Sequence, residues 1–144
     1  MKRTPHTAAV LALGAVLVAG TAACSTDSAA KPDKMGVVEK LPADTDKAQS
    51  KKNAQEFRSW INEHGSAQQK DAAGRVQRII GEWNEKTGNA YISTDINGGK
   101  TQVEDPQAAA TAIVKAFAGW KDSDQGYASV YDVFGNAMVT NYKF

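Results

Sequence analysis

Few residues of this sequence have the types and spacing that catalysis requires. A serine nucleophile needs a nearby base, and the only histidines are His6, near the N-terminus, and His64, which precedes Gly65. No Gly-x-Ser-x-Gly motif is present, and a histidine before a glycine is typical of a helix C-terminus, where the helix dipole favours positive charge. Zinc needs three or four nitrogen or sulfur ligands, and His64 with the single cysteine, Cys24, is too few. We therefore expect no catalytic residue.

Calcium is the other metal to consider, because Asp122-Ser123-Asp124 and Asp95-Ile96-Asn97 place oxygen ligands two positions apart. An EF-hand loop needs Gly at its sixth position and Glu at its twelfth. Those positions hold Tyr127 and Val133 in one segment, and Lys100 and Pro106 in the other. An irregular calcium site at Asp122 and Asp124 stays open, but a turn whose Asp and Ser side chains bond their own backbone explains the segment better. We predict no metal and no cofactor.

Cys24 has a clearer chemical assignment. The basic pair Lys2-Arg3 precedes an apolar run over residues 8–20 and the small residues Thr21-Ala22-Ala23, which is the order of a secretory signal peptide. The segment resembles bacterial lipoprotein signal sequences, although the family's usual leucine is replaced by Thr21. That resemblance implies cleavage before Cys24 and a diacylglycerol on its sulfur. Stable attachment needs more than one acyl chain, which such a cysteine supplies.

The location of the protein depends on this cleavage. Residues 1–23 are the predicted signal peptide, and a lipidated Cys24 would hold the chain at the extracellular face of the cell membrane. Ordinary signal peptidase cleavage after Thr21-Ala22-Ala23 or Ser28-Ala29-Ala30 would instead release a secreted protein. An uncleaved anchor is the remaining alternative, but the apolar run is shorter than the roughly 20 residues that cross a bilayer.

Residues 24–52 are predicted to be a flexible stalk, because they are rich in Ser, Thr, Asp, Lys, Ala and Pro and have little apolar surface to bury. Gly36-Val37-Val38 could alternatively be a strand that docks on the domain edge. Cleavage before Cys24 removes Lys2 and Arg3, which leaves 15 of the 17 basic residues against 16 acidic ones. A near-neutral chain has no electrostatic footprint for nucleic acid, so we exclude that partner.

The predicted globular domain covers residues 53–144 and begins with a helical hairpin. Its first helix carries Phe57, Trp60 and Ile61 on one face and ends at His64-Gly65. The second begins at Ser66, where Gln69 completes a capping box, and runs to about Gly88. Its predicted buried stripe consists of Ala72, Val76, Ile79, Ile80 and Trp83. A third helix is predicted from Asp105-Pro106 to Trp120.

Alternating apolar residues predict a strand over residues 90–96, and two β-rich runs, 127–133 and 137–144, flank Phe134-Gly135-Asn136 as a hairpin. Lys100 to Glu104 could alternatively pair back as a short partner strand, an interpretation that Val103 alone supports. The predicted order is α-α-β-α-β-β. We expect an α+β fold in which the helical hairpin and third helix cover one face of a largely antiparallel three-stranded sheet.

Aromatic residues give the remaining candidate site. Tyr91, Tyr127 and Tyr131 could share one sheet face with Ser93, Asp95 and Ser129 and form an aromatic, polar binding surface. The alternative is that strand tyrosines fill half-buried positions. Trp60, Trp83 and Trp120 are assigned to core packing.

One longer pattern carries a second resemblance. Glu63-His64-Gly65, Ala116 to Gly126, Val130-Tyr131-Asp132 and Gly135 together resemble small actinobacterial secreted or lipid-anchored proteins without an assigned activity. This resemblance implies a shared fold and no catalytic residue. We therefore expect a lipid-anchored, non-enzymatic binding module whose partner is an envelope protein or glycan. The alternative is a small envelope hydrolase or an enzyme inhibitor.

Overall fold

The computed structural model describes residues 40–98 and 102–144, which form three helices and four strands. The predicted signal peptide, Cys24 and most of the predicted stalk lie outside the described residues. Along the chain the elements are α2 (Lys47–His64), α3 (Ala67–Ala73), β1 (Val76–Ile80), β2 (Thr87–Thr94), α4 (Pro106–Trp120), β3 (Gln125–Tyr131) and β4 (Ala137–Lys143). In the described part of the chain, no helix is long and apolar enough to cross a membrane.

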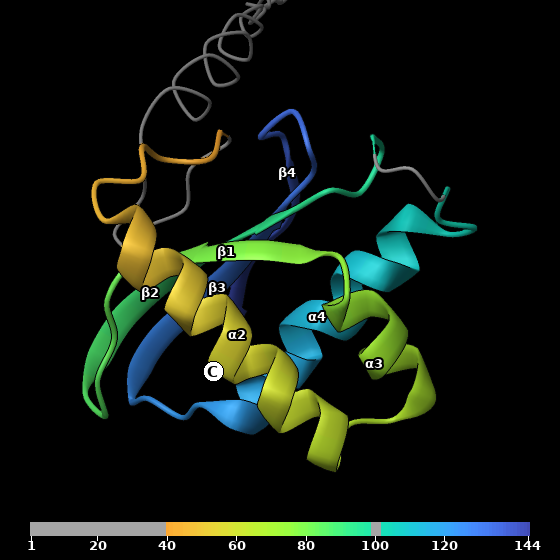
Figure 1. The fold of residues 1–144 in the computed structure, drawn as a ribbon. Helices are drawn as coiled ribbons and strands as arrows, with labels where there is room; N and C mark the ends of the chain where they lie inside the picture. Colours follow the sequence, from red (N-terminus) through yellow and green to blue (C-terminus); the bar gives the residue numbers. More distant parts are fainter. Residues whose placement is uncertain (1–39, 99–101) are drawn as a thin grey trace, which may run out of the picture. The chain divides into compact units, whose positions relative to one another are not determined.

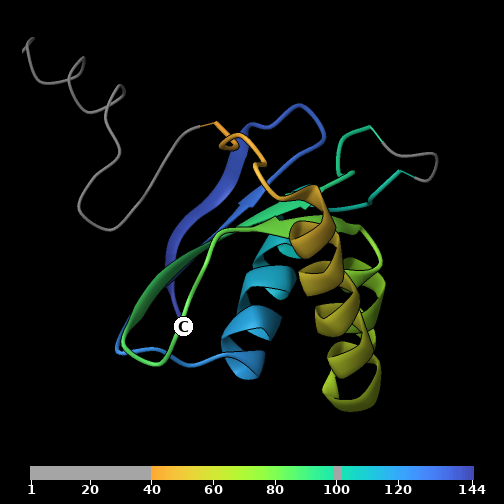
Figure 2. The same ribbon diagram turned by 60° about the vertical axis from the view of Figure 1, so that its left-hand side comes forward.

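The strands form one mixed sheet in the order β1-β2-β3-β4. The outer pairs, β1 with β2 and β3 with β4, are antiparallel, whereas the central β2 and β3 are parallel. A parallel pair needs a crossover connection, which α4 provides. The three helices lie on one face of the sheet (Figures 1 and 2). The predicted α+β class is confirmed, but the three-stranded, largely antiparallel sheet is wrong.

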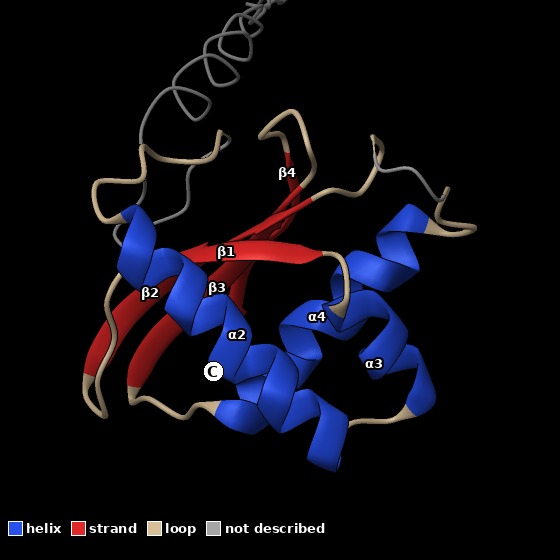
Figure 3. Cartoon of the chain, viewed as in Figure 1, coloured by secondary structure: helices blue, strands red, loops and turns tan. Residues whose placement is uncertain are grey.

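The main error is the segment after α3, which was predicted to continue as a helix to Gly88. The capping box at Ser66 and Gln69 is present, but the helix ends at Ala73, and Val76–Ile80 is strand β1 (Figure 3). The register of β1 against β2 shifts between Val76 and Arg78, as a β-bulge produces. The bulge places Val76 and Ile79 on the same sheet face although they are three residues apart. A helical spacing therefore occurs in a strand.

Two other segments agree with the sequence. Helix α4 begins at Pro106, with the Asp105 carboxylate accepting a hydrogen bond from the Ala108 amide, and ends at Trp120, as predicted. The predicted C-terminal hairpin is confirmed as β3 and β4. Helix α2, in contrast, begins at Lys47 rather than near Asn53, because Asp46 caps it and accepts a hydrogen bond from the Gln49 amide. In the described part of residues 100–104, which begins at Gln102, no strand is present.

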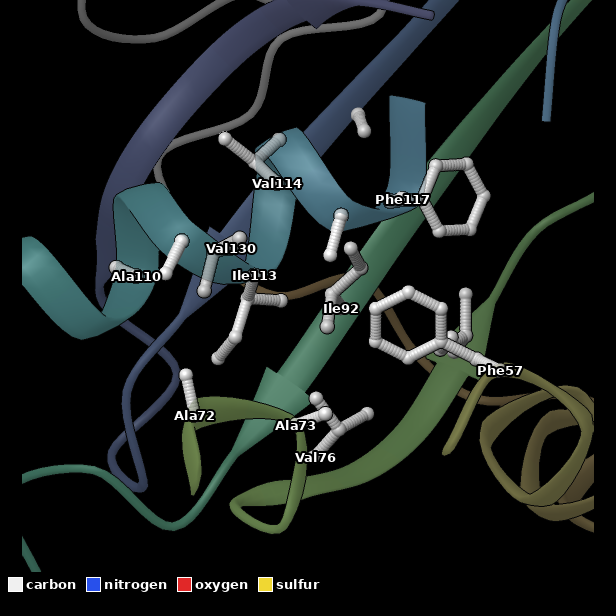
Figure 4. Packing of buried hydrophobic residues seen from close by; sticks show 14 of the residues in the cluster. Phe57, Ala72, Ala73, Val76, Ile92, Ala110, Ile113, Val114, Phe117 and Val130 are labelled. Carbon is white, nitrogen blue, oxygen red and sulfur yellow. The ribbon is translucent and has the colours of Figure 1, made fainter. Parts of the chain in front are cut away.

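The core lies between the helices and the sheet, and Figure 4 shows its apolar side chains meeting there. Ile92 and Val130 from the central strands and Ile113 and Phe117 from α4 are fully buried. Phe117 packs against Phe57 of α2, with ring centroids 5.9 Å apart, and against the C-terminal Phe144 at 4.9 Å. These rings connect a helix, the crossover and the end of the chain in one cluster.

Residues before α2 also contact the domain. The Leu41 amide donates to the Gly135 carbonyl at 2.9 Å, and Lys40 forms an isolated bridge with Asn136. Asp44 pairs with Arg78 of β1 at 2.9 Å and its side chain is only 3% exposed. The part of the predicted stalk from Lys40 onward is therefore held against the sheet.

Candidate functional site

The tyrosines singled out from the sequence do share one face of the sheet. Parallel pairing places Tyr91 beside Ser129, Tyr131 beside Ser93, and Tyr127 beside Asn89. Directly paired residues point to the same side, and this is the face opposite the helices, since Ile92 and Val130 on the other face pack against α4. We call it the tyrosine face. The rings of Tyr91 and Tyr131 lie 6.4 Å apart.

This face does not present its central tyrosine to solvent. Tyr131 is 0% exposed, and the neighbouring Ser129 and Ser93 are also buried, whereas Tyr91 and Tyr127 are half-buried. Burial raises the pKa of Tyr131 to about 12, although its hydrogen bond with the Ser129 side chain acts in the opposite direction. Tyr131 is therefore a neutral phenol at physiological pH that no partner can touch in this conformation.

The other candidates from the sequence lie apart from one another. His64 is exposed at the end of α2, where its ring stacks on Trp60 with centroids 4.6 Å apart. Asp95 forms an ion pair with Arg75 at 3.2 Å, while Asp122 and Asp124 are exposed on the loop before β3. Within residues 40–98 and 102–144, no three His, Cys, Asp or Glu residues come together as a metal site.

A different site appears where three distant segments meet. A cleft of about 740 Å³ lies between the first half of α2, the loop that joins β1 to β2, and the end of α4. We call it the tryptophan cleft, and its lining residues are Asp46, Gln49, Asn53, Glu56, Gly81, Glu82, Trp83, Asn84, Thr87, Gly88, Trp120 and Lys121. Half-buried aromatic rings beside polar groups are typical of ligand sites.

The α2 wall follows from helix periodicity. Asp46, Gln49, Asn53 and Glu56 are spaced by three or four residues and so share one face. Asn53 ties this wall to the sheet, because its side-chain amide donates to the Ile79 carbonyl at 3.0 Å and accepts from the Gln49 side chain at 2.8 Å. This buried contact keeps α2 at a fixed distance from β1.

The loop between β1 and β2 forms the second wall and is held by its own hydrogen bonds. The Asn84 side chain accepts from the amides of Lys86 and Thr87, at 2.8 and 3.1 Å. Trp83 forms an isolated antiparallel β-bridge with Gly88, and the Asn89 amide donates to the Glu82 carbonyl at 3.1 Å. Trp83 is thereby fixed against the core before any ligand binds.

Phe117 contacts both tryptophans of the cleft from the core side. Its ring meets Trp83 edge to face at 5.4 Å and Trp120 at 5.7 Å. Trp120 also packs on Phe57 at 5.6 Å. The sequence assignment of Trp83 and Trp120 to packing is therefore correct as far as it goes, but each ring keeps part of its surface open to the cleft.

The charges around the cleft are mostly negative. Asp46, Glu56 and Glu82 contribute carboxylates, and Lys121 is the single cation among the described residues that line the cleft. Glu56 lies 3.9 Å from Lys52, but both side chains are more than half exposed, so this pair holds it weakly. The ammonium group of Lys121 lies 4.0 Å from the ring centroid of Trp120, a cation–π contact. The cleft thus already holds one positive charge against an aromatic ring.

A second hollow, of about 830 Å³, lies between α3 and the segment that leads into α4. Among the described residues that line it, none is aromatic, and its surface consists of short aliphatic, amide and charged side chains. The aromatic and acidic chemistry of the tryptophan cleft is therefore the more specific of the two.

Comparison with protein families, with curated proteins and with solved structures finds no match for this chain. The resemblance to small actinobacterial lipid-anchored proteins accordingly stays a prediction.

Proposed function

We propose that the mature chain is a binding module tethered outside the cytoplasm by a lipidated Cys24, and that the tryptophan cleft is its ligand site. The order of charged, apolar and small residues before Cys24 supports the tether. The cleft supports binding because its two tryptophans are held rigidly by Phe117 and its walls by hydrogen bonds. Such a site loses little conformational freedom when a ligand enters.

The ligand class follows from the contact between Lys121 and Trp120. Aromatic faces attract cations, by about 0.5 to 2 kcal/mol according to burial, and Asp46, Glu56 and Glu82 strengthen that preference. A positive side chain of the protein itself occupies the ring face. We therefore propose that a partner's ammonium or guanidinium group takes this position, as the Lys or Arg side chains of a basic envelope protein would.

The enzymatic alternative has less support. A hydrolase that uses His64 would need it in the cleft, but His64 lies eight residues beyond Glu56 on the same helix, about 12 Å further along the axis. Its ring is stacked on Trp60 instead. The carboxylates of the cleft are better suited to attracting a cation than to a reaction that depends on this histidine.

Titration of the full mature chain with a tri-lysine peptide, followed by tryptophan fluorescence, tests the cleft. Glu82→Gln should weaken binding about two- to fivefold, because one exposed carboxylate contributes a few tenths to one kcal/mol. The matched control is Glu85→Gln, an exposed carboxylate on the same loop that does not line the cleft, and it should leave binding unchanged.

Lys121→Gln gives the sharper result. Removing its ammonium group frees the Trp120 ring and removes repulsion, so tri-lysine should bind about two- to fivefold more tightly. Lys115→Gln, on α4 but outside the cleft, is the control. Weaker binding by Lys121→Gln, or binding of a neutral oligosaccharide that Glu82→Gln does not affect, would overturn the cationic ligand class.

The tether is tested separately by mass spectrometry of the N-terminal peptide from native membranes. We expect a peptide that begins at Cys24 and carries acyl chains, and a Cys24→Ser chain that leaves the membrane fraction. An unmodified thiol at Cys24 would refute the tether without affecting the cleft.

A further inference from the structure

Two large apolar side chains are exposed next to each other in the turn between β3 and β4. Among the described residues, Val133 is 44% exposed and Phe134 is 71% exposed, and these are the large hydrophobic residues that the fold leaves in solvent. Single exposed apolar residues are ordinary on protein surfaces. Val133 and Phe134, however, lie together at the tip of one turn, and the other large apolar side chains are at least partly covered. This pair therefore indicates a contact site.

The turn is rigid. The buried Asp132 carboxylate accepts hydrogen bonds from the amides of Phe134 and Asn136, both at 2.9 Å, and from the Asn97 side chain at 3.2 Å. Burial alone would raise the pKa of Asp132, but these hydrogen bonds hold it below its ordinary value. The Val133 amide donates to the Ile96 carbonyl at 2.9 Å. Phe134 is therefore held outward by an ordered backbone.

The first described residues, Lys40 and Leu41, lie against this same turn. The Leu41 amide bonds the Gly135 carbonyl, and the ammonium group of Lys40 bonds the Asn136 side chain. Figure 1 shows the first described residues beside the end of the β3–β4 hairpin. Residues 25–39 are all that separate Cys24 from Lys40, a reach of at most about 55 Å when fully extended.

We infer that the Val133-Phe134 turn contacts the membrane surface and inserts its two side chains at the level of the lipid headgroups when the chain is tethered. This inference rests on the proposed lipidation of Cys24, because the described chain on the Cys24 side begins at Lys40, which is bonded to this turn. Aromatic side chains favour the interface between water and hydrocarbon. Lys40, bonded to the same turn, adds a positive charge that attracts anionic lipids.

The test uses the lipidated full chain in vesicles of phosphatidylglycerol and phosphatidylethanolamine. A polarity-sensitive fluorophore is attached at Phe134→Cys. The control carries the same fluorophore at Glu63→Cys, on the far end of α2. Only the introduced cysteine is labelled, because an acylated Cys24 does not react. At position 134 the emission should shift to shorter wavelength and be quenched by lipids brominated on their acyl chains. At position 63 neither change should occur.

Identical emission at both positions, on chains that float with the vesicles, would overturn the membrane contact while leaving the tether intact. A second measurement avoids the label. The Cys24→Ser chain should bind the same vesicles weakly. Adding Phe134→Ser should reduce that binding about five- to thirtyfold, because the variant loses one aromatic side chain that would be mostly buried in the lipid. Unchanged binding would also refute the inference, as would shielding of position 134 by an envelope protein in the absence of lipid.

Discussion

Gly81 controls the wall of the tryptophan cleft that carries Trp83, and its replacement by alanine should disrupt that wall. Gly81 has φ +111°, a region that side chains rarely adopt, and an added Cβ would collide with the Asn89 carbonyl oxygen. The strained conformation alone costs about 1 to 3 kcal/mol. Relief of the collision requires the Asn89 backbone to move, so we expect Gly81→Ala to lower the free energy of unfolding by about 2 to 4 kcal/mol.

The control is Gly119→Ala in the last turn of α4. Its added Cβ would lie 3.6 Å from the Trp60 ring, an ordinary contact, and its φ is not positive. Alanine is favoured over glycine in helices, so this variant should be as stable as the wild type or gain up to about 1 kcal/mol.

Urea unfolding followed by tryptophan fluorescence measures both variants, and tri-lysine titration measures the cleft. Gly81→Ala should also weaken tri-lysine binding, because the loop no longer holds Trp83 against Phe117. A loss of stability below about 1 kcal/mol with unchanged binding would show that the loop tolerates a side chain at Gly81, and the argument that its backbone fixes Trp83 would fail.

Two further predictions concern buried polar groups. Because burial raises the pKa of Tyr131 from 10.0 to about 12, its contribution to the free energy of unfolding is complete below pH 10 and is lost as the pH rises toward 12. Tyr131→Phe should therefore lose less stability at alkaline pH than the wild type. Urea unfolding between pH 7 and about 11.5 measures this difference. Asp44→Asn breaks the ion pair with Arg78 and alters the bond from Ser50, both at 2.9 Å, and should cost about 1 to 3 kcal/mol. Proteolysis before Lys47 should become faster in that variant, and an unchanged rate would mean that the pair does not hold this segment.

Local signals in the sequence were sufficient for some elements. Asp105-Pro106 and the Ser66 capping box fix helix starts through hydrogen bonds made within three residues, so α4 and the start of α3 could be predicted. The C-terminal hairpin could also be predicted from a local signal, because Gly135 and Asn136 separate two β-rich runs. The relative direction of paired strands could not be predicted, because nothing in the local sequence indicates that β2 pairs in parallel with β3.

Strand β1 shows how a local pattern can mislead. Val76 and Ile79 have helical spacing and are both buried on one side, which a straight strand would not produce. The bulge between them adds one residue and restores the shared face. Helix α2 gave the opposite error: Ser50 and Asn53 are buried polar residues, so the first turns resemble a solvated stalk, although their side chains bond Asp44 and Ile79.

The candidate site could not have been found from spacing. Its walls come from residues 46–56, 81–88 and 120–121, which approach one another only after β1 forms and α4 crosses the sheet. Trp83 and Trp120 were visible as aromatic residues, but a tryptophan that packs on the core and one that also borders a cleft look the same in sequence. The tyrosine face was assembled correctly by alternation, yet alternation cannot indicate that Tyr131 is enclosed.

The parallel pairing of β2 and β3 has a consequence for where a ligand would be held. Both strands run in the same direction, so the β1–β2 loop with Trp83 and the β3–β4 turn with Phe134 lie at opposite ends of the sheet. The seven residues of β3 span about 23 Å. With Phe134 at the lipid surface, the sheet would act as a rigid spacer that holds a group bound in the tryptophan cleft up to about 23 Å above the headgroups when β3 stands upright, whatever the length of the lipidated segment.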